Sequence, residues 1–145
     1  MSLAISGFAL GCNDAGDPTP AGDISIAIQQ ALTGQTTSAG TFTVTGVLSD
    51  GGETTEELTF GGALTQPFVP ITYRRVLTGS RGTMILTGSA TLTWTSPTAG
   101  ALSGSWSVES GTGVYLSGGG SLSGIANFGA TPPTATLTYV GTINQ

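Results

Sequence analysis

The sequence predicts an all-β fold, an eight-stranded antiparallel β-barrel, on three observations. Apolar and polar residues alternate with a period of two from Ile24 onward, which places every second side chain on one face of a strand. The links between these runs are short, and short links join antiparallel neighbours. No window shows the spacing of an amphipathic helix. Eight such strands can close into a barrel and so remove unpaired sheet edges; a two-sheet β-sandwich is the alternative.

The first four expected strands cover residues 24–32, 41–49, 53–60 and 69–79. In the first, Ile24, Ile26 and Ile28 alternate with small or polar residues, and in the second Phe42 and Val44 alternate with threonines. Threonine suits the wet side because β-branched residues fit a pleated, half-exposed surface. The third and fourth strands alternate in the same way, but each carries one charged residue on its apolar side.

The last four expected strands cover residues 82–95, 102–109, 119–128 and 134–143. The fifth is the most regular, and its apolar residues are Met84, Leu86, Ala90, Leu92 and Trp94. In the three strands that follow, the apolar positions are Leu102, Trp106, Val108, Leu122, Ala126, Phe128, Ala135, Leu137, Tyr139 and Ile143. Each strand therefore has one buried and one exposed side.

The length of 145 residues favours one domain, which we place at residues 23–145. Residues 1–22 are expected to form an N-terminal arm or linker, because "NDAGDPTPAGD" is rich in proline, glycine and aspartate. The preceding apolar run ends in Cys12 and has a faint likeness to a lipoprotein signal. The compartment is left open between the cytoplasm, which we favour, and secretion or lipid anchoring through Cys12. No stretch approaches the ~20 apolar residues of a membrane-spanning helix, so we expect no transmembrane segment.

Composition excludes several functional classes. The net charge is -5, and the basic residues are three arginines with no lysine or histidine, so nucleic acid is not an expected partner. Histidine chemistry is excluded, and the serines and threonines lack a histidine or lysine that would activate them as nucleophiles. A single cysteine can form no internal disulfide. We expect no metal and no cofactor.

The stretch "SGTGVYLSGGGSLSG", residues 110–124, raises the question of a phosphate-binding loop. A dinucleotide fingerprint needs Gly-x-Gly-x-x-Gly between a strand and a helix. Here Gly111 and Gly113 are followed by four residues before Gly118, and the next element is another strand. The glycines are therefore expected to supply positive φ angles and bulges where a barrel strand bends.

The same stretch carries a family resemblance. "VESGTGVYLSGGGSLSG", with "AGTFTVTG" before it and "ATLTYVGTI" after it, resembles the allene oxide cyclase and dirigent barrel superfamily, particularly its small uncharacterised bacterial members. A Gly-Thr-Gly-x-Phe/Tyr turn of that family is matched by residues 111–115, and the resemblance spans roughly residues 23–143. It implies an eight-stranded antiparallel barrel, often assembled into dimers or trimers. It brings no catalytic residues to this chain.

Two charged residues lie on apolar faces. Glu56 shares the parity of Leu58, and Arg75 shares the parity of Tyr73. A hairpin centred near residues 65–66 places Phe60 opposite Ile71, Leu58 opposite Tyr73 and Glu56 opposite Arg75. A salt bridge is therefore predicted, because an unpaired ion inside a barrel costs several kcal/mol. Its role is either structural, which we favour, or that of a ligand-pocket lining.

Candidate ligand-binding residues share the apolar parity. They are Glu56, Tyr73, Arg75, Trp94, Trp106 and Tyr139. The four aromatic residues could form the wall of a small apolar cavity, although filling the core is the simpler role and the one we favour. Half of the acidic residues lie in "DGGETTEE", which is expected to be a solvated turn because it lacks the ligand spacing of a calcium loop. Arg74 is expected to be exposed.

Three functional classes follow. The favoured one is a barrel that binds a small apolar or amphipathic molecule without chemistry. The second is an isomerase or cyclase in which Glu56 acts as an acid or base on a small hydrophobic substrate. The third is an assembly module with a solid core. Since only 8% of the residues are charged, we also expect a homo-oligomer, a dimer or trimer.

Overall fold

The computed structural model describes residues 22–115 and 117–144, and within them the chain forms eight β-strands and no helix. The strands are β1 (Gly22–Leu32), β2 (Thr37–Gly46), β3 (Asp50–Phe60), β4 (Phe68–Gly79), β5 (Gly82–Trp94), β6 (Ala99–Gly111), β7 (Ser117–Asn127) and β8 (Thr134–Asn144). The predicted all-β class is confirmed. Across these residues, no helix is long and apolar enough to cross a membrane. Residues 1–21 of the expected N-terminal arm, with Cys12, lie outside the described residues, and Gly22 is the first residue of β1.

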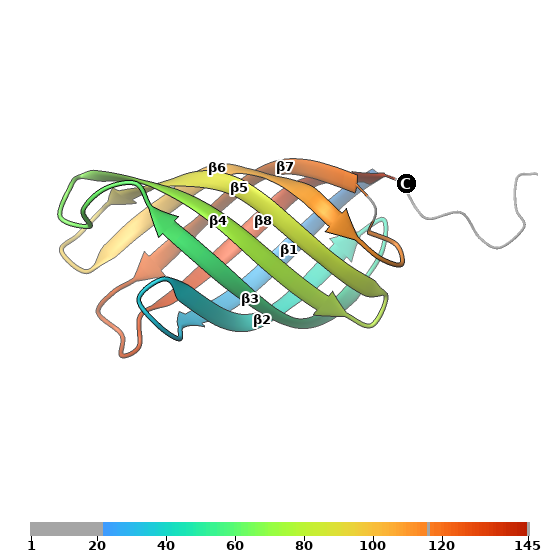
Figure 1. Cartoon of the computed structure of the whole chain (residues 1–145), viewed down its shortest axis with the longest axis horizontal. Coiled ribbons are helices and arrows are strands. Elements are labelled where there is room, and N and C mark those ends of the chain that lie inside the picture. The colour runs from blue at the N-terminus through green and yellow to red at the C-terminus, as the bar shows by residue number, and fades with distance from the viewer. Residues whose placement is uncertain (1–21, 116, 145) are drawn as a thin grey trace, which may run out of the picture.

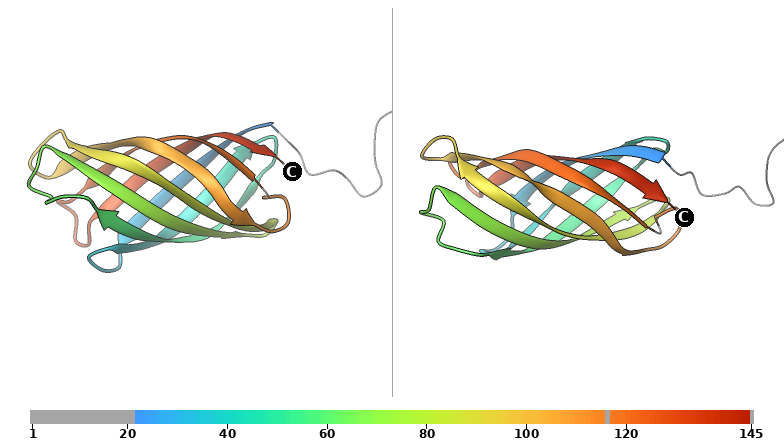
Figure 2. Two further views of the ribbon diagram at one scale, coloured as in Figure 1. Left: turned by 45° about the horizontal axis from the view of Figure 1, so that its top comes forward. Right: turned by 90° about the horizontal axis from the view of Figure 1, so that it is seen from above.

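The strands form one closed barrel in sequence order. Each strand pairs antiparallel with the next, and β8 pairs with β1 from Gly22↔Ile143 to Ala31↔Thr134, which leaves no edge. Figure 1 shows the strands wound obliquely around the barrel axis, and Figure 2 shows the same closure from two further sides. The eight-stranded antiparallel barrel is therefore confirmed, and the sandwich is not formed.

Some strand boundaries differ from those expected. β2 begins at Thr37 rather than at residue 41, and it ends at Gly46, so that the buried Leu48 lies beyond it. The segment "DGGETTEE" is not a turn but the first part of β3, and this expectation was wrong. The segment is rich in glycine and acidic residues, a composition that is typical of turns. On β3, however, Glu53 and Glu57 point outward into water, so a strand leaves these charges as well solvated as a turn would.

The alternation of side chains along each strand separates the inner side of the barrel from its outer side. The inward residues of all eight strands form the core, and the outward residues are mostly threonine and serine. The links β2–β3, β4–β5 and β6–β7 lie at one end of the barrel, which we call the closed end, and the other four links lie at the opposite end, which we call the mouth end (Figure 1).

The closed end is tied together by Asp50. Its carboxylate accepts hydrogen bonds from the Tyr115 hydroxyl at 2.6 Å, the Gly51 N–H at 2.7 Å, and the Ser80 N–H and hydroxyl, each at 3.0 Å. The Arg81 N–H adds a longer one at 3.3 Å. Partial burial would raise the pKa of Asp50, but these donors, Tyr115 first, outweigh it and hold the pKa below its ordinary value. One carboxylate thus joins three strand connections.

The β6–β7 turn contains the glycines that the sequence singled out. Gly113 has a φ of 65°, and a Cβ there would meet the carbonyl oxygen of Arg81. The ladder between β5 and β6 shifts register between Ile85 and Leu86. The expected positive φ is confirmed at Gly113 and Gly118, and the next element is a strand, as expected. The bulge, in contrast, lies at Glu109, which has no partner in this ladder, and not at one of these glycines.

Candidate functional site

The predicted pairing of β3 with β4 is confirmed. The register places Glu56 opposite Arg75 and Leu58 opposite Tyr73. The Oε2 atom of Glu56 lies 2.8 Å from Nη2 of Arg75, and the two residues are 5% and 0% exposed. The sequence therefore places a buried ion pair inside the barrel, and its neighbours must compensate for the lost hydration of both charges.

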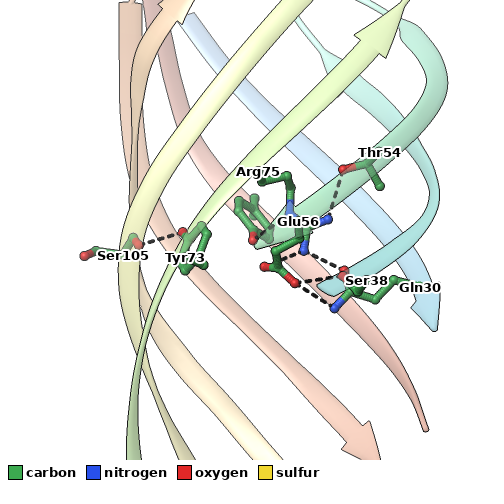
Figure 3. Close-up of polar contacts among 8 residues, drawn as sticks. Gln30, Ser38, Thr54, Glu56, Tyr73, Arg75 and Ser105 are labelled. Atoms are coloured by element: carbon green, nitrogen blue, oxygen red, sulfur yellow. Dashed lines mark hydrogen bonds and ion pairs between the residues drawn. The ribbon is translucent and has the colours of Figure 1, made fainter. Parts of the chain in front are cut away.

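The carboxylate of Glu56 has partners on two further strands. Its Oε1 atom accepts hydrogen bonds from Nε2 of Gln30 on β1 and from the hydroxyl of Ser38 on β2, both at 3.0 Å (Figure 3). With the Arg75 contact on Oε2, both carboxylate oxygens are engaged. Glu56 is therefore held in one orientation by three strands besides its own.

The guanidinium of Arg75 uses three nitrogens. Nη1 donates to the Thr54 hydroxyl at 3.0 Å, Nη2 to Oε1 of Gln30 at 2.6 Å, and Nε to the Tyr139 hydroxyl at 3.1 Å. Its central carbon also lies 5.6 Å from the centre of the Tyr139 ring. Figure 3 shows Gln30 and Thr54 reaching this group from different strands. We call Gln30, Ser38, Thr54, Glu56, Arg75 and Tyr139 the polar cluster.

The surroundings of Arg75, Tyr139 and Tyr73 fix the protonation of these three side chains. Burial by itself lowers the pKa of Arg75, but Tyr139 and Glu56 outweigh it and raise that pKa above its ordinary value. Burial raises the pKa of Tyr139 and of Tyr73. Both phenols are therefore protonated near neutral pH, and the guanidinium keeps its charge.

An apolar cavity of about 70 Å³ lies beside the polar cluster. Its lining residues are Gln30, Leu32, Glu56, Leu58, Phe60, Ile71, Tyr73, Ala90, Leu92, Leu102, Leu122, Ala126, Phe128, Pro133, Thr134, Ala135, Leu137 and Tyr139. Phe128 and Pro133 belong to the β7–β8 link, so the cavity reaches the mouth end. Gln30, Glu56, Tyr73 and Tyr139 form what we call its polar wall, and most of the remaining lining is hydrocarbon.

The six candidate residues divide into two groups. Glu56, Tyr73 and Tyr139 line the cavity, whereas Arg75 does not line it and contacts Glu56 and Tyr139. Trp106 and Trp94 do not line it themselves. The Trp106 ring packs against Tyr139 with 6.2 Å between centres, and its Nε1 donates to the carbonyl of Val140 at 3.1 Å.

Trp94 lies at the mouth end. Its ring packs on Phe128, 4.9 Å between centres, and its Nε1 donates to the carbonyl of Leu64 at 2.9 Å. The indole therefore joins the β3–β4 link to the β7–β8 link and supports a cavity-lining ring from behind. Each tryptophan thus contacts one aromatic residue of the cavity lining, Trp106 contacting Tyr139 and Trp94 contacting Phe128.

Gln30, Ser38 and Thr54 were not among the candidates. Gln30 and Thr54 share the inward parity of their strands. A polar residue at an otherwise apolar position of a strand is a signal that could have identified both. Ser38 precedes residue 41, where the second strand was expected to start, so its parity could not be assigned. All three satisfy groups of the ion pair.

Comparisons with protein-family models, with curated proteins and with solved structures give no match. Within residues 22–115 and 117–144, no group of three or more histidine, cysteine, aspartate or glutamate side chains is placed to hold a metal ion. The cavity therefore offers a ligand its polar wall and its apolar lining. This lining suits an uncharged, mostly apolar molecule.

Proposed function

We propose that the protein binds a small, mostly apolar molecule in the barrel cavity without changing it chemically. The observation that carries this proposal is an apolar void beside a polar cluster whose charges already compensate one another. Ligand sites are typically concave and apolar with a few placed polar groups. A solid core, the alternative for an assembly module, would leave no such void.

The size of the void limits the ligand. Drug-sized ligands fill pockets of about 300–1,000 Å³. A cavity of about 70 Å³ is well below that range, so it takes a slim molecule or one segment of a larger molecule. Because the void reaches the β7–β8 link, the remainder of a longer ligand would lie at the mouth end.

The contacts of Glu56 favour binding over catalysis. Gln30, Ser38 and Arg75 use three of the roughly four lone-pair sites of the Glu56 carboxylate, so little of it is left to act as an acid or base on a ligand. The isomerase or cyclase alternative, and with it the resemblance to allene oxide cyclases and dirigent proteins, remains a prediction. Turnover that depends on Glu56, measured with Glu56→Gln once a ligand is known, would support that alternative.

A cavity-filling variant tests the proposed site. Ala126 lines the cavity, so Ala126→Leu fills it, whereas the matched control Ala27→Leu adds the same atoms on the outer face of β1. We expect wild type and Ala27→Leu to bind the apolar probe 1-hexene, detected through tryptophan fluorescence, and Ala126→Leu to lose that binding. Equal binding by all three proteins would show that the probe lies elsewhere and would reject the site.

We also propose that the barrel assembles into a dimer or trimer through the outer face of β7 and β8. These neighbouring strands contain no charged residue, and the outward Ile125 is 64% exposed, with Val140 half-exposed beside the same face. Interface centres are depleted of charge, and two copies of net charge -5 approach with least repulsion where charges are absent.

Sedimentation velocity tests this assembly. We expect wild type and Phe68→Glu, which alters an exposed apolar residue on β4, to sediment as the same oligomer. Ile125→Glu should sediment as a monomer, because it buries an unpaired charge in the proposed interface. A monomeric wild type at high concentration would contradict the proposal.

A further inference from the structure

We infer that the ligand carries an uncharged carbonyl oxygen, as in a ketone, aldehyde or ester, and that Gln30 and Tyr139 bind this oxygen. The inference rests on the proposed function and names the class of molecule that the cavity selects. It follows from the hydrogen bonds that the polar wall has already made and from those it can still make.

Two donors of the polar wall can give a hydrogen to a ligand. The amide nitrogen of Gln30 has two hydrogens and gives one to Glu56, while its oxygen accepts from Arg75. The hydroxyl oxygen of Tyr139 accepts from Arg75, and its own hydrogen can turn either to the cavity or to the adjacent Tyr73 hydroxyl, with which it shares a hydrogen-bonding contact. Tyr73 differs, because its hydroxyl already donates to the carbonyl of Ser105 at 2.8 Å.

The two donors belong to one arrangement. Gln30 contacts Nη2 and Tyr139 contacts Nε of the same guanidinium, so Arg75 sets the position of both. Both side chains line the cavity, whereas Arg75 does not. A carbonyl oxygen has two lone pairs and can accept from both donors at once, which a hydrocarbon cannot do. The remaining lining provides the apolar surface for the body of the molecule.

The ion pair explains why the head group is uncharged. Glu56 and Arg75 cancel one another, and no further ionised group lines the cavity among the described residues. A carboxylate ligand would lie against Glu56 in the polar wall. An ammonium ligand would add a second positive charge beside Arg75, with the single carboxylate of Glu56 to compensate both. A third buried charge would be unmatched in either case and would cost several kcal/mol.

A head-group series on one carbon skeleton tests the inference. 1-Hexene, 2-hexanone, hexanoate and hexylammonium are titrated into wild-type protein at pH 7, with tryptophan fluorescence as the signal. We expect 2-hexanone to bind at least about tenfold more tightly than either ion. Hexanoate or hexylammonium binding as tightly as the ketone would overturn the inference and leave the proposed function intact. Failure of both 1-hexene and 2-hexanone to bind would overturn the proposed function.

A pair of phenol variants locates the recognition. Tyr139→Phe removes the available donor and should weaken 2-hexanone binding about two- to tenfold while leaving 1-hexene binding unchanged. Tyr73→Phe is the matched control, because its own hydrogen is used within the protein, and it should not weaken 2-hexanone binding. Equal weakening of both probes by Tyr139→Phe would overturn the assignment. If that variant does not fold, the head-group series on wild type decides alone.

Discussion

Replacing Arg75 with methionine is the perturbation that the structure makes most informative. The substitution keeps an unbranched apolar stem of similar length but removes the charge. Glu56, 5% exposed, would then keep its contacts to Gln30 and Ser38 and lose its only cation. Thr54 and Tyr139 would lose their donor as well.

The expected loss is large for a single residue. Removing one partner of a buried ion pair typically costs about 3–5 kcal/mol, because the other charge is left buried and uncompensated. With a urea dependence of about 1–3 kcal/mol per molar, the unfolding midpoint should fall by roughly 2 M. Arg75→Met combined with Glu56→Leu removes both charges and should recover most of the loss, since apolar replacement of a whole pair is often near neutral.

Urea unfolding followed by tryptophan fluorescence measures these changes. Arg74→Met is the matched control, because Arg74 is the next residue and its ion pair with Glu109 is exposed on the outside, with side chains 47% and 44% accessible. We expect the control to lose about 0–1 kcal/mol. Arg75→Met losing no more than the control, or the double variant losing as much as Arg75→Met, would refute the reasoning.

Three further predictions concern the closed end. The pKa of Asp50 lies below its ordinary value of 3.8, so the stability that Asp50 contributes is present above pH 3.8 and is lost as the pH falls through its folded-state pKa. Asp50→Asn should remove this part of the acid dependence of stability, which thermal unfolding at a series of pH values measures. Tyr115→Phe should cost about 1.5–3 kcal/mol in urea, and a smaller loss than Ser80→Ala would argue against it. Gly113→Ala should cost at least about 1 kcal/mol because φ is 65°, and an unchanged midpoint would disprove the steric argument.

The barrel could be predicted because its information is local. A two-residue period of apolar side chains predicts which side of each strand is buried, and short links predict that consecutive strands pair antiparallel. The contact between Glu56 and Arg75 could be predicted for the same reason, since two charges on apolar faces must oppose each other to be tolerated inside a barrel.

The cavity and most of the polar cluster could not be predicted in this way. Ser38 could not be assigned to a strand from the sequence, because the serine and glycine at the start of β2 are typical of a turn. These residues form a strand by pairing with β1 and β3. Whether a void remains depends on which side chains meet across the barrel, and Trp94 and Trp106 share the inward parity yet stand behind other rings. The alternation of residues along a strand predicts which side chains point into the barrel, but not which of them meet across its interior.

A crystal structure of the protein soaked with 2-hexanone tests the central claim most directly. We expect the ketone inside the barrel, against the apolar lining, with its oxygen about 2.7–3.2 Å from Nε2 of Gln30 and from the Tyr139 hydroxyl. A barrel whose side chains close the void, or a ketone found only on the outer surface, would contradict it.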